Sequence, residues 1–274
     1  MTYCVGIKLD AGLVFLSDSR THAGLDQIST FRKMIVYEEP GERFMVMLSA
    51  GNLSIGQSVR ERLQVEALAN GDAPPITIWN ATSMFDAVRV LGATVRRVHD
   101  QDAAALKAEG VEFNAALIFG GQIKGEAMRL FLVYAAGNFV EATRETCYFQ
   151  FGESKYGKPV LDRMVTPATG LDEAAKCALV SMDSTLKSNL TVGLPLDLLV
   201  YERDRLQSDR IACIDERNPY FQMVRGSWGE KLRQVFESIE DPQWNGGATS
   251  VPLRVAIGRH EPLKKITHPG EKLV

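Results

Sequence analysis

The chain has 274 residues, of which 45% are hydrophobic and 24% are charged, the ordinary composition of a globular protein. Its net charge of −3 argues against a nucleic-acid partner, because such a partner is normally met by a basic surface. No run reaches the roughly 18 apolar residues of a membrane span, and charges interrupt the N-terminal segment where a signal peptide would be apolar. We therefore expect a cytoplasmic protein without membrane or nucleic-acid contacts.

Cysteine and histidine residues show no metal-ligand spacing, so we expect neither a metal nor another cofactor. The cysteines form no CxxC pair and are consistent with reduced thiols in a cytoplasmic protein. The cysteines are Cys4, Cys147, Cys177 and Cys213, and the histidines are His22, His99, His260 and His268.

Short β-rich runs begin the chain, and the apolar period then changes to that of helices. The first two runs flank Asp10-Ala11-Gly12, which we interpret as a three-residue hairpin turn. We expect early strands over Tyr3–Leu9, Leu13–Asp18, Lys33–Tyr37 and Phe44–Ser49. Ile55, Val59 and Leu63 recur at helical spacing after Asn52 or Ser54, either of which can cap a helix. The longer helix that follows Pro74-Pro75 has an apolar seam of Met84, Val88, Leu91, Val95 and Val98.

The second half repeats this order of strands followed by a pair of helices. Strands are expected at Phe113–Phe119, Arg129–Ala135, Phe139–Thr143, Cys147–Phe151, Pro195–Tyr201 and Arg210–Ile214. Helices are expected at Ser154–Met164, Leu171–Leu186 and Pro219–Ser238, the last with Phe221, Val224, Trp228, Leu232 and Phe236 facing inward. Paired helices argue against a doubly wound parallel sheet. The order favours an α+β fold in which two antiparallel sheets stack face to face and helix pairs cover their outer faces.

The start of the chain carries the strongest candidate for chemistry, since GxSxG, P-loop and HExxH motifs are absent. Removal of Met1 exposes Thr2 with a β-hydroxyl and a free α-amine on one residue. An N-terminal amine can deprotonate the hydroxyl, because its ordinary pKa of about 7.7–8.0 is close to working pH. The sequence therefore predicts that Thr2 is a nucleophile.

Three further residues fit this prediction. With the three-residue turn, Asp18 would lie diagonally across the hairpin from Thr2, although an Asp at a strand end also commonly caps a turn. Lys33 begins the third strand, where its ammonium could pair with Asp18 and lower the pKa of the amine. Gly51 lies between a strand and a helix, where backbone N–H groups can stabilise an oxyanion; an ordinary turn glycine is the alternative.

These residues together resemble a known family. Thr2, Ser17-Asp18-Ser19-Arg20-x-x-x-Gly24, Lys33 and Ser49-Ala50-Gly51 are similar to the β-subunits of the proteasome and the HslV peptidase. The opening Met-Thr-Tyr-Cys-Val-Gly-Ile and the run Asp-Ser-Thr-Leu-Lys-Ser-Asn-Leu are similar to the Anbu branch of that family. The resemblance covers approximately residues 2–215.

The resemblance implies the N-terminal-nucleophile fold, a four-layer αββα sandwich, in a single peptidase domain over 1–274 with a C-terminal helix and tail at 216–274. It implies that Thr2, Asp18 and Lys33 are catalytic and that Gly51 contributes the oxyanion hole and contacts substrate. It also implies that Arg20 and His22 lie on the strand that lines the substrate cleft.

Two family elements are altered in this chain. Gly152-Glu153-Ser154 stands where the family has Gly-Ser-Gly, so the usual supporting serine is displaced or absent. The family's Asp-x-x-Ser-Gly is stretched, which leaves Asp183 and Ser188 as the expected catalytic pair, with Thr191 or Ser154 as alternatives to Ser188.

The resemblance predicts a threonine-type peptidase that assembles into a ring or a helical homo-oligomer and cleaves peptide or amide bonds. Whether an ATPase unfoldase delivers the substrate is left open. One alternative is a hydrolase of a non-peptide amide on the same fold. Another is a catalytically silent ring-forming subunit, which would have no chemical need for the combination of Thr2, Asp18 and Lys33.

Overall fold

The computed structural model describes residues 2–22 and 28–242 of the chain. The chain divides into two compact units, Met1–Trp228 and Gly229–Val274. The first unit contains both sheets and the candidate site.

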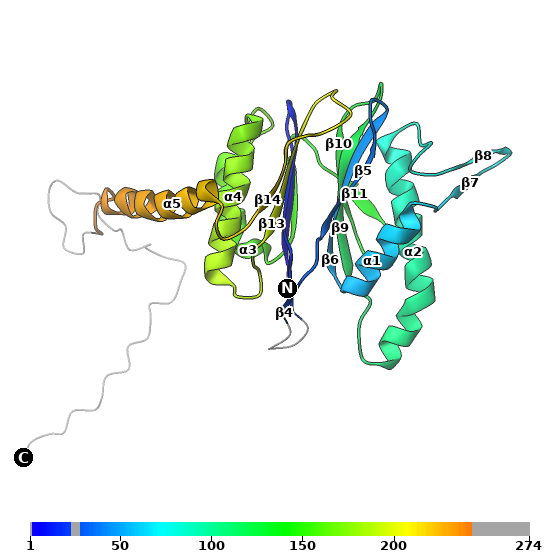
Figure 1. Ribbon diagram of the computed structural model, residues 1–274, viewed down its shortest axis with the longest axis horizontal. Helices are drawn as coiled ribbons and strands as arrows, with labels where there is room; N and C mark the ends of the chain where they lie inside the picture. The colour runs from blue at the N-terminus through cyan, green and yellow to red at the C-terminus, as the bar shows by residue number, and fades with distance from the viewer. Residues whose placement is uncertain (1, 23–27, 243–274) are drawn as a thin grey trace, which may run out of the picture. The chain divides into compact units, whose positions relative to one another are not determined.

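Two five-stranded antiparallel sheets stack face to face in the first unit (Figure 1). The first sheet has the order β12-β1-β2-β13-β14. Its strands are β1 (Tyr3–Lys8), β2 (Gly12–Asp18), β12 (Tyr148–Gly152), β13 (Leu196–Glu202) and β14 (Ile211–Ile214). The second sheet has the order β11-β10-β9-β6-β5. Its strands are β5 (Met34–Glu39), β6 (Arg43–Gly51), β9 (Ala115–Ile123), β10 (Arg129–Val133) and β11 (Phe139–Glu141).

Helices cover the outer face of each sheet, as Figure 1 shows. The first sheet is covered by α3 (Ser154–Met164) and α4 (Leu171–Ser188), and the second by α1 (Leu53–Leu63) and α2 (Met84–Ala108). This is the predicted four-layer αββα sandwich of two antiparallel sheets, so the predicted architecture is confirmed. The bounds of α3 are those expected from the sequence, and Asn52 caps α1 by accepting a hydrogen bond from the Ser54 amide at 3.0 Å.

Strand β2 packs against a different layer of the sandwich on each of its two faces. All seven of its residues are buried because both faces of the sheet are covered. Val14 and Leu16 pack toward the helices α3 and α4, whereas Leu13 and Phe15 pack between the two sheets. A third apolar cluster joins α1 and α2 to the second sheet. The rigid sandwich thereby fixes the strand ends at which the candidate site lies.

The hairpin between β1 and β2 differs from the prediction by one residue. Leu9 and Gly12 exchange backbone hydrogen bonds of 2.8 and 3.3 Å, so the loop consists of Asp10 and Ala11 alone. Cys4 consequently pairs with Ser17, and the predicted diagonal relation between Thr2 and Asp18 was wrong. Gly12, which was assigned to the turn, is instead the first residue of β2.

Two short strand pairs were not predicted from the apolar periodicity, although the family resemblance had placed Arg20 and His22 on a strand. They are β3 (Arg20–His22) with β4 (Ile28–Thr30), and β7 (Leu68–Asn70) with β8 (Ala73–Ile76). None of these strands exceeds four residues, too few for a period to be visible.

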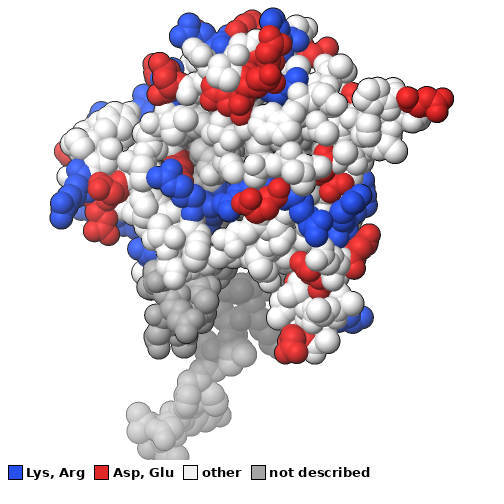
Figure 2. Space-filling view, turned by 45° about the vertical axis from the view of Figure 1, so that its right-hand side comes forward, with Lys and Arg blue, Asp and Glu red and all other residues white. Residues whose placement is uncertain are grey.

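On the face seen in Figure 2, Lys and Arg side chains are interspersed with Asp and Glu.

Helix α5 (Pro219–Glu237) begins in the first unit and ends in the second. Phe221 and Val224 are buried, as expected, but Leu232 and Phe236 are exposed. The inward placement predicted for those two residues was therefore wrong for the part of the chain that is described. Helical periodicity identifies an apolar face but not what covers it. We call Leu232, Val235, Phe236 and Ile239 the distal apolar face.

None of the helices in the described part of the chain combines the length and the hydrophobicity that a membrane span requires.

Candidate active site

A buried ion pair lies beside the start of β1. Asp18, the last residue of β2, is fully buried, and its Oδ1 accepts hydrogen bonds from Lys33 Nζ at 2.7 Å and from the Tyr3 amide at 3.0 Å. The Gly193 amide donates to Oδ2 at 3.5 Å. Burial raises the pKa of the Asp18 carboxyl, whereas the Lys33 ammonium and the two backbone N–H groups act in the opposite direction.

Lys33 directly precedes β5 of the second sheet. Its side chain reaches Asp18 of β2 in the first sheet. Its ammonium donates to Asp18 and, at 2.7 Å, to the carbonyl oxygen of Arg20. The Lys33 side chain is only 6% exposed, so these hydrogen bonds are shielded from water and hold the charge in one place. The structure thus brings together Asp18 and Lys33, which the sequence had only paired by inference.

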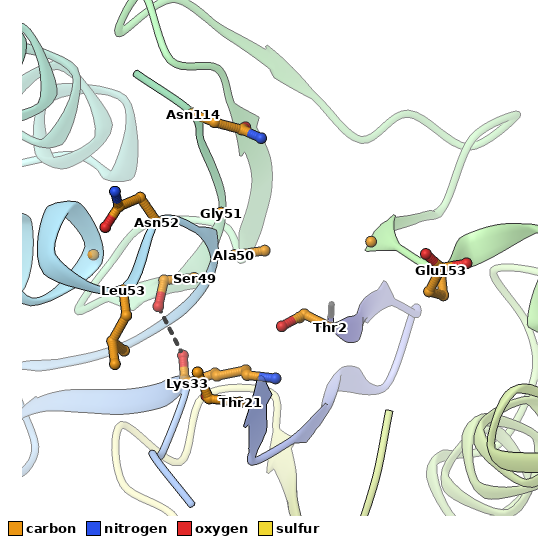
Figure 3. A pocket seen from close by; sticks show the side chains of 12 residues that line it. Thr2, Thr21, Lys33, Ser49, Ala50, Gly51, Asn52, Leu53, Asn114 and Glu153 are labelled. Carbon is orange, nitrogen blue, oxygen red and sulfur yellow. Dashed lines mark hydrogen bonds between the residues drawn. The ribbon is translucent and has the colours of Figure 1, made fainter. Parts of the chain in front are cut away.

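Thr2 and Lys33 line a common cavity of about 480 Å³ at the end of the sandwich. Figure 3 shows the Thr2 hydroxyl and the Lys33 ammonium directed into the same part of the cavity, while the Ser49 hydroxyl donates to the backbone carbonyl oxygen of Lys33. The cavity is lined by Thr2, Thr21, Lys33, Ser49, Ala50, Gly51, Asn52, Leu53, Gly56, Asn114, Gly152 and Glu153.

Gly51 forms the wall of this cavity where β6 passes into α1. Its φ of +102° lies in a region that other residues rarely adopt, and a Cβ there would lie 2.2 Å from the carbonyl oxygen of Asn114. The next amide, that of Asn52, donates to the same oxygen at 2.9 Å. A glycine is therefore required for this close approach of β6 to the segment that precedes β9.

The opposite wall is formed where β12 passes into α3. Gly152 has a φ of +80°, and a Cβ there would lie 1.8 Å from the carbonyl oxygen of Thr2. The amide of Glu153 donates to that oxygen at 2.8 Å. The backbone of the candidate nucleophile is thus held directly by the Gly152-Glu153 junction.

The other predicted catalytic residues lie elsewhere. Asp183 is a buried residue of α4 whose Oδ1 accepts a hydrogen bond from Arg225 Nε of α5 at 2.9 Å. Ser188 is the exposed last residue of α4. The Thr191 hydroxyl donates to Asn189 Oδ1 at 2.6 Å, and Ser154 is the first residue of α3. None of these four is among the described residues that line the cavity.

Two of the three residues expected to contact substrate, Arg20 and His22, belong to β3. The Arg20 guanidinium donates to the Leu190 carbonyl oxygen at 3.2 Å and lies against Gly193, where a Cβ would be 2.0 Å from its Nε. His22 pairs with Ile28 across the β3–β4 ladder, and its side chain lies outside what the structure describes. Gly24 of the predicted motif likewise lies outside the described residues.

Two polar residues of the lining, Thr21 and Asn114, were not singled out from the sequence. Thr21 is a neighbour of Arg20 on β3, and Asn114 directly precedes β9. No local motif marks these two residues, because only the fold brings their segments to one cavity. Glu153, which follows β12, belongs to the Gly152-Glu153-Ser154 element noted in the sequence, but it was not expected to line the site. Within residues 2–22 and 28–242, no His, Cys, Asp and Glu side chains are grouped in a way that could hold a metal ion.

No protein-family model matches this chain. The curated proteins likewise contain no match to it.

Solved structures, by contrast, are similar over most of the chain. Anbu (ancestral beta-subunit) from Yersinia bercovieri is 49% identical with a TM-score of 0.81, covering 88% of this chain and 99% of that one. Anbu from Hyphomicrobium sp. strain MC1 is 44% identical with a TM-score of 0.78, covering 88% and 99%. A structure described as the helical assembly of the Anbu complex from Pseudomonas aeruginosa is 44% identical with a TM-score of 0.81, covering 88% and 98%. The chain therefore belongs to the Anbu family of proteasome-related, β-subunit-like proteins.

Proposed function

We propose that this protein is a threonine-type peptidase whose nucleophile is Thr2, once the peptide bond that precedes this residue has been cleaved. The observation that carries the proposal is that Thr2, Lys33 and Gly51 line one cavity, with Lys33 hydrogen-bonded to the fully buried Asp18. This arrangement provides a hydroxyl, a fixed positive charge and a strand end that terminates in glycine around one cavity.

The α-amine of Thr2 is the proposed general base. Its ordinary pKa of about 7.7–8.0 leaves part of it unprotonated near neutral pH. The nearby Lys33 ammonium disfavours a second positive charge and so lowers the pKa of the amine. Asp18 acts through Lys33, because its carboxylate fixes the position of the ammonium.

In the proposed reaction the Thr2 Oγ1 attacks the carbonyl carbon of the scissile amide as its proton moves to the α-amine. A backbone N–H group at the Gly51 turn stabilises the developing oxyanion, a contribution that is typically worth about 10²–10³ in rate. The C–N bond then breaks and the leaving amine takes the proton. Water hydrolyses the resulting ester on Thr2 and restores the free hydroxyl.

Self-assembly of the chain is part of the same proposal. A related protein from Pseudomonas aeruginosa is described as a helical assembly. The distal apolar face is exposed within residues 2–22 and 28–242, and exposed apolar patches commonly mark protein contacts. A ring or a helix of copies would restrict access to the cavities and limit cleavage of folded proteins.

The direct test is to incubate the purified protein with a library of short peptides and simple amides, and to identify the products by mass spectrometry. The proposal predicts peptide cleavage that is lost in Thr2→Ala while the assembly is unchanged. Cleavage of non-peptide amides alone would support the alternative substrate class on the same fold. Undiminished peptide cleavage by the alanine variant would refute the proposed nucleophile.

A further inference from the structure

We propose that Glu153 determines the specificity of the cavity by binding a cationic group of the substrate, either a primary ammonium or a guanidinium. This inference rests on the proposed function, because it names the substrate class of the same site. Figure 3 shows Glu153 across the cavity from Ser49, Ala50 and Gly51, with Thr2 between the two walls.

The backbone of Glu153 is fixed to the candidate nucleophile. Its amide donates to the Thr2 carbonyl oxygen at 2.8 Å. This contact requires glycine at position 152, where φ is +80° and a Cβ would lie 1.8 Å from the same oxygen. Glu153 and Thr2 also line the same cavity, so a substrate placed for attack by Thr2 lies in the cavity that Glu153 helps to form.

Helix α3 is anchored close to this junction. A Cβ on Gly157 would lie 2.3 Å from Ser181 Oγ and 2.5 Å from Tyr3 Oη, so α3 approaches β1 and α4 as closely as glycine allows. Tyr3 Oη and Ser181 Oγ are themselves hydrogen-bonded at 2.6 Å. The first turn of α3, and with it Glu153, is thus held on rigid elements, as a specificity residue needs to be.

The Glu153 carboxylate has weak partners within the described part of the chain. Its side chain is 11% exposed, and its one ion pair there is with Lys155 at 3.7 Å, whose side chain is 71% exposed. An exposed ion pair of this length stabilises a protein little. Lys33, the other charged residue of the lining, is already bound to Asp18. Glu153 therefore gives the cavity a negative charge that is available to a ligand.

Capping of α3 does not explain the glutamate. Residue 153 is the N-cap of α3, but its side chain makes no capping hydrogen bond to the helix. Ser, Thr, Asp and Asn are strongly preferred at this position because their side chains do make that bond. A residue that departs from a local structural preference is a candidate for a functional role, and this one lines the cavity.

These observations lead to a substrate class. A carboxylate shielded from water, without a hydrogen-bonded partner among the described side chains, forms strong charge-assisted hydrogen bonds with an ammonium or guanidinium group. The same charge repels acidic groups, so the site discriminates in both directions. The cation can come from a Lys or Arg side chain or from the free N-terminus of a short peptide, and the experiment separates these sources.

The test measures peptide binding to the full chain carrying Thr2→Ala, so that turnover does not interfere. The ligands are matched short peptides: N-acetylated with lysine, N-acetylated with norleucine or glutamate in its place, and the norleucine peptide with a free N-terminus. Calorimetry should show that a cationic peptide binds on the order of tenfold more tightly than the neutral one. Preference for the acetylated lysine peptide identifies a side chain as the source, and preference for the unacetylated norleucine peptide identifies the terminal amine.

Charge variants assign the preference to this residue. Glu153→Gln should remove the advantage of the cationic peptide, and Glu153→Lys should transfer it to the glutamate peptide. Glu145→Gln is the matched control, because it makes the same change at a fully exposed residue between β11 and β12 and should keep the advantage. Circular dichroism should show that each variant is folded.

The outcomes separate this inference from the proposed function. Equal binding of cationic and neutral peptides, or a cationic preference that survives in folded Glu153→Gln, overturns the inference. Peptide boronates that fail to modify Thr2 of the unsubstituted protein overturn the proposed nucleophile instead. A Glu153-dependent preference for cationic peptides supports the inference whether or not that modification occurs.

Discussion

Lys33 Nζ lies 2.7 Å from Asp18 Oδ1, and both side chains are buried. Each charge compensates the burial of the other, so removal of one partner leaves an uncompensated charge inside the protein. Because Lys33 also lines the cavity that contains Thr2, the pair places a positive charge beside the proposed nucleophile.

Replacement of Lys33 tests the role of that charge. Lys33→Ala should lower kcat/KM on the order of 10²-fold and shift its alkaline rise to higher pH, since the pKa of the Thr2 amine is no longer depressed. The measurement is the pH dependence of peptide cleavage, with thermal unfolding recorded to show that the variant is folded. Lys124→Ala, which removes a surface lysine paired with Glu42, is the control. An unchanged pH profile would show that Lys33 has no effect on the base.

Asp18 should make the stability of the protein depend on pH. Burial raises the folded-state pKa of this carboxyl above its ordinary value of 3.8, so the folded state binds the proton more tightly than the unfolded state. As pH rises from the unfolded to the folded pKa, the unfolded state loses its proton first, and the free energy of unfolding falls. Urea unfolding over this pH range should show the fall in the unsubstituted protein and a smaller fall in Asp18→Asn. Identical slopes would contradict this assignment.

Gly51 is predicted to be sensitive to substitution for two separable reasons. Gly51→Ala places a Cβ 2.2 Å from the Asn114 carbonyl oxygen and also imposes an unfavourable φ. Gly41→Ala is the matched control, because Gly41 has a φ of +78° but no atom near the added Cβ. The control should lose about 1–3 kcal/mol of unfolding free energy from backbone strain alone, and Gly51→Ala should lose more and also lose activity. Equal losses in the two variants would show that the close contact relaxes without cost.

The distal apolar face is predicted to contribute to self-assembly. Phe236, 74% exposed in the described chain, should be buried against another copy in the assembly. Phe236→Asp should therefore yield smaller particles in multi-angle light scattering, whereas the unsubstituted protein should have a mass many times 30.3 kDa. Gln234→Asp introduces the same charge two residues earlier and should leave the particle mass unchanged. A monomeric and fully active unsubstituted protein would refute assembly as a requirement for function.

The sequence predicts the local elements of this fold well, because their signals are local. The bounds of α3 agree with those predicted, and Asn52 is the one of the two predicted cap candidates, Asn52 and Ser54, that caps α1. The register of β1 against β2 was missed by one residue. Turn residues alone do not distinguish the two-residue loop Asp10-Ala11 from a loop that includes Gly12, and the backbone hydrogen bonds decide it.

The candidate site was predictable only where short motifs mark it. Asp18 and Lys33 could be paired from their positions at strand ends, but the spacing that selected Asp183 gave no sign of its contact with Arg225 of α5. Glu153 enters the cavity because β12 lies beside β1, a pairing of residues far apart in the sequence. Such long-range pairing depends on the packing of the whole sandwich, which no single segment encodes.

The most direct test of the account is intact-protein mass spectrometry before and after treatment with a peptide β-lactone or boronate, followed by mapping of the modified residue. We expect a mature chain that begins at Thr2 and a single adduct on that residue, which is absent from Thr2→Ala. A chain that retains Met1, or an adduct that forms equally on Thr2→Ala, would contradict the assignment of Thr2 as the nucleophile.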